Sequence, residues 1–120
     1  MNIKKVKVTE VGPRDGFQSE KTILNTDDKI DVINNLIDAG FPRIEVSSFV
    51  SPKAIPQLAD AATILENVKR NHEATLAALV PNARGALRAV DAKLDEIVVF
   101  LSASETVSYT HLRAHETPCH

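Results

Sequence analysis

The sequence has little of several things that mark particular classes of protein. Of its 120 residues only Cys119 is a cysteine, so no internal disulfide can form. Tryptophan is absent and aromatic residues make up 4%, which leaves no stacking platform for nucleic-acid bases. Basic residues are not in excess, since 14 Lys and Arg stand against 16 Asp and Glu, for a net charge of -2. Nucleic acid is therefore not a predicted partner, nor is an anionic membrane.

The sequence also lacks a long apolar run and the pattern of a targeting segment. No stretch approaches the roughly 20 apolar residues that a membrane-spanning helix needs. The first five residues lead at once into alternating polar and apolar positions, without the apolar run of a signal peptide. Together with the single cysteine, this indicates a cytoplasmic protein.

What the chain does have is an alternation of strand-like and helix-like segments. Strands are predicted over residues 4–9, 43–47, 74–80 and 96–101, and the apolar runs of the last two predict strands buried on both faces. A first helix is predicted to be capped by Asn25 or Thr26 and ended by Gly40, with Ile30, Ile33, Leu36 and Ile37 on its apolar face. A second helix is predicted from near Ile55 or Gln57 to Lys69. The third is marked by Ala83, Leu87, Val90 and Leu94.

This order predicts an α/β fold with parallel strands and right-handed crossovers. Polar or small residues follow each strand, so they gather on one rim, as in a (β/α)8 TIM barrel. A flavodoxin-like doubly wound sheet is the alternative, although no glycine-rich dinucleotide fingerprint follows the first strand. A complete barrel needs about 250 residues, so four strands and three helices predict its N-terminal half.

The stretch Glu10–Gln18, with the sequence Glu-Val-Gly-Pro-Arg-Asp-Gly-Phe-Gln, is the one that suggests chemistry. Gly12 and Pro13 end the first strand, so Arg14 and Asp15 are expected on a loop at its carboxyl end, where such sheets bind ligands. The carboxylate can hold a hard cation, and the guanidinium can grip a carboxylate or an enolate. A surface Arg–Asp pair in a turn is the alternative interpretation.

Residues 107–120 have a different character. They lack an apolar period, and they hold three of the four histidines and the only cysteine and tyrosine. His111 and His115, followed by Cys119, suggest a transition-metal site. Residues 107–116 nevertheless read as the translation of a transposase sequencing adaptor whose junction falls inside Thr106. We therefore expect a non-native, disordered tail that does not belong to the fold.

Residues 1–106 resemble the hydroxymethylglutaryl-CoA lyase family, one of the DRE-TIM metallolyases. The resemblance is carried by residues 10–18, by Ile-Glu-Val-Ser-Ser-Phe-Val-Ser-Pro-Lys at 44–53 with Pro56, Gln57 and Asp60, by Leu-Val-Pro-Asn at 79–82 with Gly85, and by Phe100 with residues 102–105. The Arg-Asp-Gly-x-Gln element alone also marks isopropylmalate and homocitrate synthases and biotin-linked carboxyltransferases. A fragment of such an enzyme is one alternative, and a non-catalytic α/β binding module is another.

The resemblance implies retro-Claisen cleavage of 3-hydroxy-3-methylglutaryl-CoA to acetyl-CoA and acetoacetate, a reaction of leucine degradation, with Mg²⁺ or Mn²⁺ as cofactor. It implies that Asp15 binds the metal, that Arg14 steadies the enolate and that Glu45 is a second catalytic residue. Gln18 and Ser48 are implied to bind the acyl-CoA substrate. The full-length enzyme is expected to be a homo-oligomer.

Each of these roles has a structural alternative. Glu45 could be a buried acid paired with Arg14 or Arg43. Ser48 could shape the loop, and Gln18 could cap or pack. The remaining metal ligands that the resemblance implies, a His-x-His pair and an Asn, belong to later strands, as does the catalytic cysteine. We therefore expect the 120-residue chain to be inactive.

Overall fold

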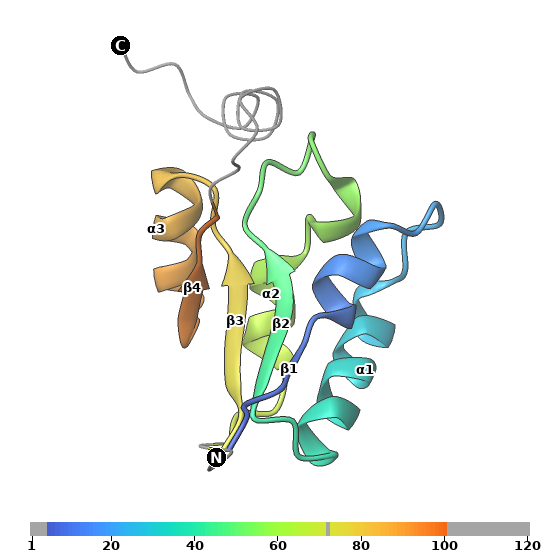
Figure 1. Ribbon diagram of the computed structural model, residues 1–120. Helices are drawn as coiled ribbons and strands as arrows, with labels where there is room; N and C mark the ends of the chain where they lie inside the picture. The colour runs from blue at the N-terminus through green and yellow to red at the C-terminus, as the bar shows by residue number, and fades with distance from the viewer. Residues whose placement is uncertain (1–4, 72, 101–120) are drawn as a thin grey trace.

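The computed structural model describes residues 5–71 and 73–100 of the chain. Four strands of this part lie side by side in one sheet: β1 (Thr9–Glu10), β2 (Arg43–Ser48), β3 (Thr75–Leu79) and β4 (Glu96–Val98) (Figure 1). Between them run the π-helical turn η1 (Gly12–Gly16), helix α1 (Thr26–Asp38), the 3-10 turn η2 (Pro56–Leu58), helix α2 (Ala61–Asn67) and helix α3 (Ala83–Asp91). No helix in the described ranges is both long enough and apolar enough to cross a membrane.

The order of the strands decides between the two predicted architectures. All three pairings are parallel, and the strands follow one another in sequence order, β1-β2-β3-β4. A flavodoxin-like sheet would instead place β1 between β2 and β3. The predicted α/β class and the N-terminal part of a barrel are thereby confirmed.

One face of the sheet carries the hydrophobic core and the other is polar. Ile44 and Val46 of β2 pack with Leu76 and Ala78 of β3 in the core cluster that also contains residues of α1 and α2. On the opposite face Arg43 donates from Nε to Glu96 Oε1 at 2.9 Å and from Nη1 to Thr9 Oγ1 at 3.2 Å. Because this one side chain of β2 reaches both edge strands, the sheet curves around its polar face, as the wall of a barrel does.

Helix α1 follows the sequence prediction closely. The Asn25 side chain accepts a hydrogen bond from the backbone N–H of Asp28 at 2.8 Å, which caps the helix. Ile33 and Ile37 are buried in the core. Gly40 has a φ of 92°, a left-handed conformation that favours glycine and ends the helix.

Three predictions about the first half of the chain need correction. The first strand is shorter than predicted and starts at Thr9 rather than residue 4. Arg14 and Asp15 lie in the helical turn η1 rather than on a loop, because Pro13 suits the start of a helix. The second helix is divided into η2 and α2, and Asp60 lies at the division with its carboxylate turned to α1.

The predicted apolar face of the third helix is not the buried face of α3. Leu87 is 69% exposed and Val90 72% exposed, whereas Gly85 and Ala89 are buried. A Cβ atom built on Gly85 would lie 2.5 Å from the carbonyl oxygen of Phe49. The backbone of α3 thus comes so close to the loop after β2 that only small residues fit between them.

Strand β4 was predicted to be buried, and this is wrong. Ile97 is 51% exposed and Val99 72% exposed, and in the described residues β4 is the edge of the sheet. The apolar run that suggested a buried strand therefore faces solvent here. The polar loop predicted at 102–105 and the tail at 107–120 lie outside the described residues.

Candidate functional site

Arg14 joins the first two strand ends of the sheet. Its Nε donates to Glu45 Oε1 at 3.1 Å, and its Nη1 lies 3.3 Å from Asp15 Oδ1. The Arg14 and Glu45 side chains are only 20% and 10% exposed. Asp15 and Glu45 therefore lie at the same end of the sheet, as a common site at the strand ends requires. Of the two alternatives for Glu45, its ion-pair partner is Arg14 and not Arg43.

The turn η1 is what aims Arg14 at β2. The carbonyl oxygen of Val11 accepts the backbone N–H groups of Arg14 at 3.2 Å and of Asp15 at 2.8 Å. Pro13 is buried against the fold, which fixes the turn on the end of the sheet. Successive side chains of a helical turn point in different directions, so Arg14 faces Glu45 while Asp15 remains 64% exposed.

A cavity of about 380 Å³ lies at this end of the sheet. This volume is within the range of small-molecule sites. Four of the five predicted site residues line it, namely Arg14, Gln18, Glu45 and Ser48, while Asp15 lies beside it. The structure thus brings together polar side chains from two separate segments of the sequence, the segment that follows β1 and strand β2.

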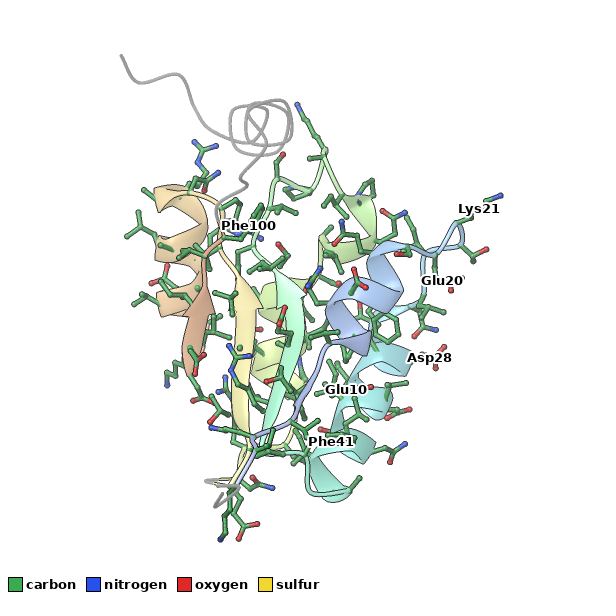
Figure 2. All side chains as sticks on the ribbon, in the orientation of Figure 1. Glu10, Glu20, Lys21, Asp28, Phe41 and Phe100 are labelled. Atoms are coloured by element: carbon green, nitrogen blue, oxygen red, sulfur yellow. The ribbon has the colours of Figure 1, made fainter. Side chains whose placement is uncertain are left out.

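Sequence reasoning did not identify the apolar wall of the cavity. Leu79, Val98 and Phe100, at or just beyond the ends of β3 and β4, line the side opposite Arg14. Figure 2 shows Phe100 just past β4, at the end of the sheet that carries the η1 turn. The available signal was their position as the last residues of two strands, because such positions face the rim of a barrel.

The donor set at the site suits part of a magnesium or manganese shell. Carboxylate oxygens are the ligands that these hard cations prefer. Arg14 contacts both carboxylates, but the Asp15 carboxylate is 64% exposed and can still reach a cation, whereas the Glu45 carboxylate is only 10% exposed. In the described ranges no cluster of three or more His, Cys, Asp or Glu residues could hold a metal ion. These residues could therefore contribute to a metal site but could not complete it.

Lys29, a buried residue that the sequence analysis did not identify, holds the loop after β2 close to the segment that follows η1. Lys29 of α1 is 1% exposed, and its Nζ donates to Asp60 Oδ1 at 2.9 Å and to the carbonyl oxygen of Gln57. The Gln57 side chain in turn donates to the carbonyl oxygen of Glu20 at 3.0 Å. Lys29 shares a helix face with Ile33, where an apolar residue is the usual expectation.

Comparison with known proteins shows that the chain is similar to lyases. It is 50% identical over 103 residues to the hydroxymethylglutaryl-CoA lyase of Bacillus subtilis, covering 86% of this chain and 34% of that protein. It is 46% identical over 107 residues to the mitochondrial hydroxymethylglutaryl-CoA lyase of Arabidopsis thaliana, covering 89% of this chain and 23% of that protein. The chain thus spans only about a quarter to a third of the length of these relatives.

The solved structure of a related lyase has the same fold as the described part of this chain. The HMG-CoA lyase of Acinetobacter baumannii, in complex with coenzyme A and 3-methylmalate, superposes with a TM-score of 0.85 at 48% sequence identity, over 88% of this chain and 34% of that one. The four-stranded sheet accordingly matches the N-terminal part of that lyase barrel. A family model described as HMGL-like matches residues 5–117. With nearly its whole length matched, the chain belongs to the HMGL-like family.

Proposed function

We propose that the chain is the N-terminal portion of a lyase that cleaves 3-hydroxy-3-methylglutaryl-CoA to acetyl-CoA and acetoacetate. The observation that carries this proposal is the Arg14–Glu45 ion pair at the cavity, with Asp15, Gln18 and Ser48 around it. Residues 1–106 are the lyase part in this proposal, and residues 107–120 are a non-native tail. The two lyase relatives and the solved lyase support the reaction class.

Asp15 is our candidate for a ligand of a divalent cation, Mg²⁺ or Mn²⁺. Its carboxylate is exposed and lies beside the cavity. The other acidic group there, Glu45, is largely buried against Arg14. When bound, the cation would supply a Lewis acid for the oxygen atoms of the substrate. The other ligands would come from residues beyond the described part of the chain.

Arg14 is our candidate for stabilising the negative charge that develops on the departing acetyl-CoA. Its Nε is occupied by Glu45, which holds the guanidinium plane in place. The terminal N–H groups can then donate to an enolate oxygen in the cavity. Glu45 acts by orienting Arg14, since the two side chains are largely withdrawn from solvent.

Gln18 and Ser48 are our candidates for binding the acyl-CoA. Both line the cavity, and the Ser48 hydroxyl lies 3.4 Å from the carbonyl oxygen of Leu79, so it can turn toward a ligand at little cost. The opposite wall is apolar and suits the methyl-bearing carbon chain of the substrate. Coenzyme A is bound in the solved lyase of Acinetobacter, which supports an acyl-CoA as the substrate class.

We also propose that the full-length enzyme is a cytoplasmic homo-oligomer that serves leucine degradation. Residues 1–106, the lyase part in this proposal, contain no cysteine and therefore no disulfide framework, which supports a reducing compartment. The 120-residue chain itself is expected to be inactive, because the described residues supply too few metal ligands. Acetoacetate release from the purified chain with Mg²⁺ should therefore equal the buffer rate.

A chimera tests the proposed function directly. Residues 5–100 of this chain would replace the matching segment of the Bacillus subtilis lyase, and acetoacetate release from 3-hydroxy-3-methylglutaryl-CoA would be measured. The chimera should retain activity, and Arg14→Met should reduce kcat by about 10²–10³-fold, as loss of an oxyanion donor does. Lys53→Met, at an exposed loop position, is the matched control and should leave kcat unchanged. A folded chimera that releases no acetoacetate would refute the proposal.

A further inference from the structure

The motif residues Gln57 and Asp60 do not line the cavity, yet they lie where the two chain segments beside it meet. The segment between β1 and α1 carries Arg14 and Gln18. The loop after β2 carries Gln57 in η2, and Figure 1 shows η2 next to η1. The Gln57 side chain joins the two segments, because its Nε2 donates to the carbonyl oxygen of Glu20 at 3.0 Å. This hydrogen bond links positions 37 residues apart in the sequence.

Glu20 lies two residues beyond Gln18 and is connected to it by short-range hydrogen bonds. The backbone N–H of Glu20 donates to the carbonyl oxygen of Phe17 at 3.3 Å. The carbonyl oxygen of Asp15 accepts the backbone N–H of Ser19 at 3.3 Å and the Ser19 hydroxyl at 3.0 Å. Gln18 is enclosed by these bonds, so a contact that holds Glu20 also holds Gln18.

Gln18 thus lies between two links that join the same pair of segments. At one end Arg14 donates from Nε to Glu45 Oε1 at 3.1 Å. At the other end the Gln57 amide donates to the Glu20 carbonyl. The first link acts directly on Arg14, whereas the second acts on the residues next to Gln18. Loss of the second link should therefore free Gln18 and leave Arg14 in place.

The backbone of Gln57 is anchored to α1 by a buried ion pair. Lys29 of α1 is 1% exposed, and its Nζ donates to the Gln57 carbonyl oxygen and to Asp60 Oδ1 at 2.9 Å. The Thr26 hydroxyl donates to Asp60 Oδ2 at 2.7 Å. An apolar pair of similar size often stabilises a fold as well as a buried ion pair does, and Leu58, at 2% exposed, already buries η2. What the ion pair adds is a fixed orientation of η2 and of the Gln57 side chain.

We propose that Gln57 is a positioning residue for the acyl-CoA site, where it holds the segment that carries Gln18. This inference rests on the proposed function of that site. Gln57 acts through Glu20, since it is not one of the residues that line the cavity. A site that adopts its binding-competent arrangement for only part of the time has an apparent affinity lowered by that fraction. Loss of the link should therefore raise KM, while kcat, which depends on Arg14, stays near its original value.

Hydrogen exchange tests the link in the full 120-residue chain without a substrate. Gln57→Met keeps the length of the side chain and removes its N–H donor. Residue-resolved exchange by NMR should then be about fivefold faster at the amides of Ser19 and Glu20, which is the effect of one neutral hydrogen bond on an equilibrium. Gln57→Lys restores a donor and should bring the rates back toward those of the unmodified chain. Unchanged rates at Ser19 and Glu20 in Gln57→Met would overturn the proposal.

Asn67→Leu is the matched control, because it removes the same kind of hydrogen bond elsewhere on the surface. Asn67 Nδ2 donates to the carbonyl oxygen of Thr63 at 2.8 Å, within α2. The amides of Ser19 and Glu20 should exchange at their original rates in this variant. If Gln57→Met instead speeds exchange equally throughout α1 and β3, Gln57 contributes only to general stability and the proposal fails.

The lyase chimera measures the kinetic consequence. Gln57→Met should raise KM for 3-hydroxy-3-methylglutaryl-CoA by about threefold to fivefold and change kcat by less than about twofold. Gln57→Glu should raise KM further, because its carboxylate repels the Glu20 carbonyl oxygen, whereas Asn67→Leu should change neither constant. A fall in kcat with KM unchanged would overturn the positioning role. An unmodified chimera without activity would refute the proposed reaction, and the exchange rates would still decide whether Gln57 holds the segment.

Discussion

Replacing Lys29 by methionine should be among the most damaging single changes to the fold. The methionine side chain fills nearly the same space, so the change removes the ammonium group and little else. Lys29 Nζ lies 2.9 and 3.2 Å from the two Asp60 oxygens and also donates to the Gln57 carbonyl. Without it, Asp60 keeps only the Thr26 hydroxyl at 2.7 Å, and the Gln57 carbonyl loses its lysine donor.

The magnitude follows from the burial of the pair. Removing one partner of a buried ion pair costs about 3–5 kcal/mol. Lys29 is 1% exposed but Asp60 is 19% exposed, so water partly compensates the carboxylate and the lower end, about 3 kcal/mol, applies. For a chain of this size the urea m-value is about 1 kcal/mol/M, so the unfolding midpoint should fall by about 3 M. Far-UV circular dichroism measures it, with an excluded osmolyte in both samples if the variant is too unstable in plain buffer.

Two comparisons test whether burial of the ion pair causes the loss of stability in Lys29→Met. Lys69→Met removes an ammonium group of the same type from an exposed pair with Asp38, whose side chains are 58% and 54% exposed, and should cost under about 1 kcal/mol. The double variant Lys29→Met with Asp60→Leu leaves no uncompensated charge and should be more stable than Lys29→Met alone. If Lys29→Met cost no more than Lys69→Met, or if the two changes at the buried pair were additive, the reasoning would be refuted.

Three further substitutions test other contacts. Gly85→Ala should cost about 2 kcal/mol or more in urea unfolding, because the new Cβ would lie 2.5 Å from the Phe49 carbonyl oxygen; an unchanged midpoint would show that α3 can move away. Ser47→Ala should raise stability by about 1 kcal/mol, since the buried Ser47 hydroxyl has no partner in the described structure; a loss would reveal an unseen hydrogen bond. The Arg43 guanidinium donates to Glu96 and holds the pKa of its carboxyl below the usual value near 4.5. That stabilisation is complete above about pH 4.5 and is lost as the pH falls through the lowered pKa, so Glu96→Gln should flatten the acid limb of a stability–pH curve.

The elements that the sequence predicted well are those whose signals are local. The Asn25 cap and the left-handed Gly40 are decided by a few adjacent residues, and both appear where the pattern places them. The parallel order of the strands follows from the alternation of strand and helix segments. Arg14 was predicted on the rim because it follows the first strand, whereas Glu45, inside β2, was placed near the site only by the family resemblance; the two form an ion pair.

The predictions that failed depended on which neighbours each element would have. Leu87 and Val90 repeat at helical spacing, yet Gly85 and Ala89 are the buried residues of α3, and at Gly85 the Phe49 carbonyl oxygen leaves no room for a side chain. An apolar period identifies a helix but does not say which of two faces is covered. The buried Lys29 was invisible for a similar reason, since its partner Asp60 lies 31 residues away and no local pattern links the two.

The candidate site owes its shape to contacts on both sides of the loop after β2. On one side Lys29 holds Gln57, which reaches the segment that follows the η1 turn. On the other side Arg88 of α3 lies over the Phe49 ring, 5.4 Å from its centre, and donates to the carbonyl oxygen of Val50 at 3.4 Å. The loop between these two attachments begins directly after the strand that carries Glu45. The contacts that stabilise the layers of this fold therefore also fix where the cavity opens, so a substitution of Lys29 or Arg88 should alter the cavity even though neither residue lines it.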